Sequence, residues 1–131
     1  MTKQSGAFRF QLLDERYAVV RLAPESSIPA WATSGRFFSI TRTDDELSVV
    51  CRQESVPDDL TVSNDWSCLK LVGPFAFDET GIVASVTRTI ADADVGVFVV
   101  STYDGDHILV KVADLSTVTS ALRGAGHLVG R

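Results

Sequence analysis

The sequence predicts an α+β protein made of two tandem modules, each with the element order βαββαβ, the first with reduced helices. Three observations support this prediction: short runs of alternating apolar and polar residues, an apolar stripe with helical spacing, and a repeat between the two halves of the chain. The order βαββαβ is that of a ferredoxin-like domain, in which two helices cover one face of a four-stranded antiparallel sheet. We expect the first module in residues 1–64 and the second in residues 65–131.

Strands dominate the expected first module. Runs rich in β-forming residues predict strands at residues 8–12, 17–22, 37–42 and 47–52. The last two are typical of a hairpin, with residues 43–46 as its four-residue turn. Residues 28–32 can form one helical turn in a proline-containing loop. Residues 53–65 are polar, so we expect a linker that holds at most a short strand at residues 60–62.

The second module opens with a predicted strand at residues 66–72, which Gly73 and Pro74 end. A helix is predicted over residues 80–93, because apolar residues fall on one stripe at Ile82, Val83, Val86 and Ile90. Asp78 or Thr80 is the expected N-cap of this helix.

The rest of the second module is predicted as a hairpin, a helix and a strand. Strands at residues 95–102 and 107–112 flank an acidic turn at residues 103–106. Asp114 is expected to cap a second helix, which ends near Gly124. A short strand at residues 127–129 would follow.

The hairpins of the two halves align without a gap at a shift of 60 positions, which pairs Phe38 with Phe98, Asp44 with Asp104 and Val50 with Val110. The strands that precede them are only 49 positions apart, so the first half lacks 11 residues in the segment that becomes the long helix of the second. This pattern indicates two copies of one module. Chance similarity between two β-hairpins is the alternative, since hairpins share a composition.

Composition and charge exclude several classes of protein. With 131 residues, of which 45% are hydrophobic, the chain can bury a core. Its 12 basic and 17 acidic residues give a net charge of −5, so nucleic acid and anionic membranes are not expected partners. No apolar run reaches the roughly 18 residues of a membrane span. The polar residues 1–6 do not resemble a signal peptide, so we expect a cytoplasmic protein.

The residues that usually perform catalysis form no recognisable constellation. Cys51 and Cys68 lie in apolar runs and are expected to be buried, reduced thiols. His107 and His127 are expected to be surface or edge histidines, and no zinc-ligand spacing or nucleophile motif occurs. We therefore predict no enzyme activity, no metal and no cofactor.

Two segments of the second module form a candidate binding site. Residues 73–82 lead from a strand into the start of a helix, where backbone N–H groups favour a small anion such as a carboxylate. Residues 101–106 contain the carboxylates of Asp104 and Asp106, which can bind an ammonium group. An anion site beside a cation site fits the backbone end of an amino acid. A capped helix and a solvated acidic turn are the structural alternative.

At these two segments the sequence resembles a known family. Residues 73–86, GPFAFDETGIVASV, and residues 101–110, STYDGDHILV, look like the paired signatures of the small tandem ACT-domain proteins of bacteria. These proteins are similar in turn to the ACT repeats of the eukaryotic cytosolic arginine sensors, the CASTOR proteins. Residues 28–32, 37–43 and 46–51 are similar to the leading module of the same group, so the resemblance covers roughly residues 7–126.

The resemblance implies a non-catalytic regulatory protein that binds an amino acid at the seam between two ACT modules. Matched to the motifs of the family, the implied ligand-binding residues are Glu79, Thr80, Gly81, Ile82, Gly96, Val97, Thr102, Tyr103, Asp104 and Asp106. Glu79 and Asp106 would hold the cationic groups of the ligand, and backbone N–H groups around Gly81 its carboxylate. Gly96 replaces a serine of the sensors, and Gly105 an aromatic residue of one of their sites.

Only the second module carries both intact signatures, so a complete seam requires a second copy of the chain. We therefore expect a homodimer in which two second modules pair about a two-fold axis. The alternative function is a protein-interaction or dimerisation module that regulates an amino-acid biosynthetic enzyme, such as an aspartate kinase, without binding a ligand.

Overall fold

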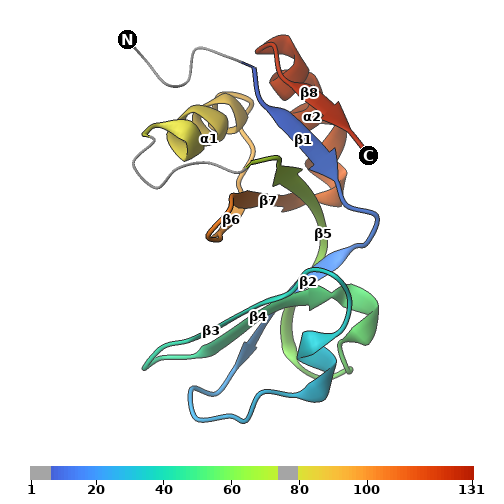
Figure 1. The fold of residues 1–131 in the computed structure, drawn as a ribbon. Coiled ribbons are helices and arrows are strands. Elements are labelled where there is room, and N and C mark those ends of the chain that lie inside the picture. The colour runs from blue at the N-terminus through green and yellow to red at the C-terminus, as the bar shows by residue number, and fades with distance from the viewer. Residues whose placement is uncertain (1–6, 74–79) are drawn as a thin grey trace. The chain divides into compact units, whose positions relative to one another are not determined.

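The computed structural model describes residues 7–73 and 80–131, and these residues divide into two compact units (Figure 1). The smaller unit is Glu15–Trp66, and the larger is Ser67–Arg131 together with the chain up to Asp14. The predicted α+β class is confirmed. The structural division between Trp66 and Ser67 is close to the expected one, but the first strand differs, because it belongs to the larger unit.

The smaller unit is an antiparallel sheet with the strand order β3-β4-β2-β5. Its strands are β2 (Tyr17–Leu22), β3 (Ser39–Arg42), β4 (Leu47–Arg52) and the first part of β5 (Thr61–Leu71). The predicted hairpin turn is confirmed, since the Thr43 N–H donates a hydrogen bond to the Glu46 carbonyl oxygen at 2.9 Å.

Helix is scarce in the smaller unit, as predicted. Residues 15–66, all of which are described, contain only two 3₁₀ turns, η1 (Ala30–Thr33) and η2 (Gln53–Ser55). A small hydrophobic core of this unit consists of Ala18, Val20, Ala32, Val49 and Cys51. Alternate residues of β2 and β4 supply most of it, because alternate side chains of a strand share one face.

Both cysteines are buried free thiols, as predicted. Burial raises the pKa of Cys68 to about 12. Burial also raises the pKa of Cys51, an effect that the Arg52 guanidinium partly opposes. Both groups are therefore uncharged near neutral pH.

Strand β5 corrects the predicted linker. A single strand covers Thr61–Leu71, where the sequence predicted a polar linker to residue 65 followed by a separate strand. The register with β2 shifts between Tyr17 and Val19, and Asp65 has a positive φ of 67°, which is the geometry of a β-bulge. Gln53 holds this bulge, because its Oε1 accepts the Asp65 N–H at 2.6 Å. The polar residues of this bulge were therefore predicted as part of a linker, although they lie inside the strand.

The larger unit contains a sheet with the order β6-β7-β5-β1-β8 and two helices (Figure 1). Its further strands are β1 (Arg9–Leu12), β6 (Phe98–Ser101), β7 (Asp106–Lys111) and β8 (Leu128–Gly130). Strand β1 lies between β5 and β8, antiparallel to the first and parallel to the second. The expectation of a four-stranded antiparallel sheet is thus wrong, because the N-terminal strand β1 is inserted and pairs in parallel with β8.

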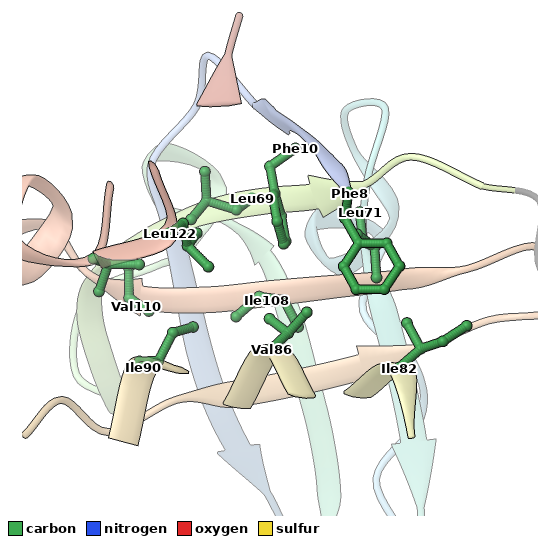
Figure 2. Packing of buried hydrophobic residues seen from close by; sticks show 11 residues of the cluster. Phe8, Phe10, Leu69, Leu71, Ile82, Val86, Ile90, Ile108, Val110 and Leu122 are labelled. Carbon is green, nitrogen blue, oxygen red and sulfur yellow. The ribbon is translucent and has the colours of Figure 1, made fainter. Parts of the chain in front are cut away.

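Helix α1 (Ile82–Asp92) packs its predicted apolar stripe on this sheet (Figure 2). Ile82, Val86 and Ile90 are buried at a spacing of four residues, and Val83 is half-buried. The shared core also contains Phe8, Phe10, Leu69, Leu71, Ile108, Val110, Val118 and Leu122. Strand β1 contributes Phe10, and Phe8 directly precedes it, so the insertion of this segment fills the core that the second module was expected to form alone.

The helix ends differ from the prediction. Gly81, with a φ of 79°, is the N-cap of α1, so Thr80 is not the cap. Among the described residues no side-chain hydrogen bond caps this helix, and Asp78 lies outside them. Asp114 occupies the N-cap position of α2 (Leu115–Gly124) without a side-chain hydrogen bond, because a 3₁₀ turn, η3 (Val112–Asp114), runs directly into the helix and gives Asp114 near-helical angles, φ −99° and ψ −2°, instead of the extended backbone of a capping residue.

Helix α2 ends in a Schellman motif. Gly126, with a φ of 94°, rather than Gly124, is the residue in the left-handed region. The Gly126 N–H donates to the Arg123 carbonyl oxygen at 3.0 Å, and the His127 N–H to that of Leu122 at 3.0 Å. This turn directs the chain into β8.

His127 is a core residue, so its predicted surface position is wrong. The side chain is 8% exposed, and its ring stacks on Phe8 with centroids 5.2 Å apart. Nδ1 accepts the Phe8 N–H at 3.0 Å, which ties the start of β1 to β8. Burial lowers the pKa of His127, since the charged form loses its hydration.

We predict that His127 makes folding stability pH-dependent. Because its pKa is lower in the folded state than the usual value of about 6.5, the unfolded chain binds the proton more readily. The free energy of unfolding should therefore fall as the pH is lowered from about 7 to 5. In His127→Asn, whose amide oxygen can still accept the Phe8 N–H, urea denaturation should show a weaker dependence on pH. An unchanged dependence would contradict this role.

Candidate functional site

A cavity of about 400 Å³ lies in the larger unit, where the end of β5 meets the turn between β6 and β7. These elements can be followed in Figure 1. The described residues that line it are Lys70, Leu71, Val72, Gly73, Thr102, Asp104, Gly105, Asp106 and His107. Residues from two segments about 30 positions apart therefore form one site.

Hydrogen bonds fix the β6–β7 turn. The Thr102 N–H and the Thr102 hydroxyl both donate to the Gly105 carbonyl oxygen, at 2.7 and 3.1 Å. At the base of the turn the Ser101 hydroxyl donates to Oδ1 of Asp106, a residue only 9% exposed. The Asp106 carboxylate is thus held in one orientation at the edge of the cavity, while Asp104 is exposed at the turn itself.

Gly105 allows the turn to approach β5. A Cβ atom at this position would lie 3.2 Å from the Leu71 carbonyl oxygen, which is closer than ordinary van der Waals contact. Gly96, in contrast, has no atom within 4 Å of such a Cβ. Gly105 therefore shapes the cavity, whereas the space around Gly96 is open.

Two residues that can carry positive charge face the same cavity. Lys70 is exposed on β5, and His107 is half-buried at the second position of β7. Burial lowers the pKa of His107, the Lys70 ammonium lowers it further, and Asp106 partly opposes both effects. At neutral pH the imidazole is therefore uncharged, and Lys70 supplies the positive charge of the described lining.

The structure brings together part of the predicted site. Thr102, Asp104 and Asp106 line the cavity, as expected for the acidic turn. Tyr103 is in the same turn but is 78% exposed and does not line it.

The other predicted residues lie elsewhere or outside the described chain. Thr80 and Gly81, at the start of α1, are exposed and absent from the described lining, and the Ile82 side chain belongs to the core. Gly96 and Val97 precede β6 and do not line the cavity of their own unit. Glu79 lies outside the described residues.

Lys70 and His107 line the cavity but were not among the predicted site residues. His107 was expected at a surface or an edge, but it lines the cavity beside Asp106. A signal for Lys70 did exist, because it is the lone charged residue in the apolar run 66–72. Alternation along that strand places it on the sheet face opposite to Leu69 and Leu71.

The arrangement is suited to binding a dipolar molecule. Carboxylates can accept charge-assisted hydrogen bonds from an ammonium group, and a lysine ammonium can donate them to a carboxylate. Within residues 7–73 and 80–131 no group of three metal-ligating side chains is found. In the same residues no helix is long and apolar enough to cross a membrane.

Comparison with known families identifies the second half of the chain. A family model described as an ACT domain matches residues 61–124, and a model of an N-terminal domain matches residues 15–59. The latter match begins after β1, in agreement with the structural division.

Several known proteins are similar to the chain. A solved structure of the protein Atu0741 from Agobacterium tumefaciens is 48% identical, with a TM-score of 0.91, and the match covers 97% of this chain and 96% of that one. The cytosolic arginine sensor for mTORC1 subunit 1 of Rattus norvegicus is 31% identical over 74% of this chain. The match spans only 34% of that sensor. The regulatory subunit of aspartate kinase from Thermus thermophilus, 9% identical with a TM-score of 0.62 over 86% of this chain and 95% of that one, shares the fold.

The fold and the sequence matches thus define an α+β domain of the type found in amino-acid sensors and in aspartate kinase regulatory subunits. The chain belongs to the ACT-domain family.

We predict that Gly105 and Gly96 differ in their tolerance of a side chain. Gly105→Ala should reduce the free energy of unfolding by about 1 kcal/mol or more, because the new methyl group is forced against the backbone of β5. Gly96→Ala is the matched control and should change stability by less than about 0.5 kcal/mol. Urea denaturation measures both. Equal stability of the two variants would show that the turn does not pack against β5 in this way.

Proposed function

We propose that the protein is a non-catalytic, amino-acid-binding regulatory protein whose ligand occupies the cavity at the β6–β7 turn. The observation that supports this most directly is the lining itself, which includes the acidic residues Asp104 and Asp106 and the basic residue Lys70. An amino acid carries the complementary pair of charges. Similarity to a cytosolic arginine sensor favours the same ligand class and a cytoplasmic location.

The Asp106 carboxylate is the proposed partner of the ligand ammonium. One of its oxygens already accepts the Ser101 hydroxyl, which fixes its position, and the second can accept from a ligand. Its low exposure strengthens such a contact, since water competes less. Asp104 and the Thr102 hydroxyl complete this end of the proposed site. Glu79 and the backbone around Gly81 stay proposed contacts from the family resemblance.

We predict that at least one of the twenty common amino acids raises the melting temperature. A ligand at 100 times its Kd stabilises the folded protein by about 2.7 kcal/mol, which corresponds to a shift of several degrees. Asp106→Asn should abolish the shift, because it keeps an acceptor for Ser101 but removes the charge. Asp92→Asn, an exposed residue at the end of α1, is the control for the loss of one charge and should keep it. Absence of a shift with all twenty would contradict the proposed function.

A second copy of the chain is proposed to complete the site. Among the described strands β6 pairs only with β7, so one edge of β6 has no strand partner there. Phe98, Val99 and Val100 make this edge apolar, and apolar edge strands pair readily with another chain. Gly96 and Val97 lead into β6. A two-fold pairing of β6 edges would therefore place these two residues at the boundary between the copies.

We predict a homodimer at micromolar concentration, measured by sedimentation equilibrium or light scattering. Val100→Glu should shift the equilibrium toward monomer, because Val100 pairs with His107 on the sheet face away from the α1 core and its replacement puts charge on the β6 edge. Circular dichroism would establish that the variant is folded. A wild-type protein that is strictly monomeric at this concentration contradicts the proposed dimer.

A second candidate is an interaction module that regulates a biosynthetic enzyme without a ligand of its own. The open space beside Gly96 favours it, because no hydroxyl side chain is present there to bind a small molecule. Co-purification of a stoichiometric enzyme partner, together with no response to amino acids, would support this candidate over the first.

A further inference from the structure

Lys70 is the cation of the candidate site and makes no ion pair with a described residue. The ion pairs found within residues 7–73 and 80–131 belong to Arg16, Arg52 and Arg131, and Lys70 is in none of them. Its ammonium is exposed, and it lines the cavity that also contains Asp104 and Asp106. A cation that faces a site and has no ion-pair partner among the described residues is available to a ligand.

The backbone determines where Lys70 points. Leu69 and Leu71 are fully buried in the core beneath the helices (Figure 2). Since successive side chains of a strand alternate between its two faces, Lys70 is on the opposite face. The burial of the two leucines therefore fixes the face of β5 from which the Lys70 side chain extends.

His107 lies in the same electrostatic cluster. Ile108 and Val110 of β7 belong to the core, which places His107 on the same face as Lys70, whereas Asp106 shares the alternation of Ile108 and Val110 and lines the cavity from the other face. Lys70, Asp106 and His107 all line the cavity, in agreement with the influence of the two charged groups on the pKa of His107.

We propose that Lys70 is a specificity-determining residue that binds the free α-carboxylate of the ligand, with His107 beside it. This inference rests on the proposed function and restricts the ligand class to free amino acids, as distinct from amines and amino-acid amides. Asp104 and Asp106 alone would attract any cation, whereas the like charge of Lys70 disfavours a ligand that lacks a carboxylate. This assigns the carboxylate to a side chain of β5, in place of the backbone N–H groups around Gly81 that the family resemblance implies.

The test compares each amino acid that binds with its α-amide by titration calorimetry, in wild type and in Lys70→Met. Wild type should prefer the acid, and Lys70→Met should weaken binding of the acid about five- to tenfold, as expected for one charge-assisted contact at an exposed site. Binding of the amide should change little. Arg88→Met, which removes an exposed cation of α1 outside the described lining, is the matched control and should bind as wild type.

A second measurement reports on the geometry without any ligand. Since the Lys70 ammonium lowers the pKa of His107, Lys70→Met should raise that pKa, which an NMR titration of the imidazole can follow. In wild type, an acid that binds should also raise it, because its carboxylate offsets the ammonium. In Lys70→Met this response should be smaller.

The outcomes separate the two proposals. If no amino acid binds wild type, the proposed function fails and the role of Lys70 fails with it. If amino acids bind and Lys70→Met binds them as tightly as wild type, the role of Lys70 is wrong while the proposed function stands. A preference for acid over amide that persists in Lys70→Met would likewise overturn the inference.

Discussion

The alternation of side chains along the end of β5 is the constraint on which the larger unit depends. Leu69 and Leu71 are buried against both helices, and complete burial of two leucines contributes on the order of 2–3 kcal/mol each. This burial fixes which face of the strand carries Lys70. The same strand pairs with β1 on one side and β7 on the other, so its position determines where the core and the cavity lie.

The candidate site follows from a close approach to this strand. Gly105 lets the β6–β7 turn come against the Leu71 carbonyl oxygen, and the Ser101 hydroxyl orients the Asp106 carboxylate at the base of the turn. Oppositely charged residues therefore line one cavity because two backbone segments meet. The Asp106 carboxylate is preorganised for a ligand, since Ser101 already orients it and little of its side-chain freedom is lost on binding.

Local patterns in the sequence predicted most elements, whereas pairings between distant segments were not predictable from them. The helical stripe of α1, the hairpin of the smaller unit and the acidic turn were all found by their periods and turn residues. The insertion of β1 between β5 and β8 depends on contacts more than 50 residues apart, which no local pattern contains. His107 was missed for the same reason, because its place in the site comes from the packing of β7 beside β5. The polar bulge at Asp65 concealed the continuity of β5, since its stabilising partner, Gln53, lies outside the strand.

The most direct test of the central claim is a ¹⁵N–¹H NMR titration of the whole protein with a mixture of amino acids. We expect backbone amide shifts concentrated in residues 70–73 and 102–107, the two segments that line the cavity. Shifts centred instead on the groove along β1 and β8, at residues 9–11 and 128–131, would place the ligand at a different surface of the same unit. That result, or the absence of any shift, would contradict amino-acid binding at the β6–β7 turn.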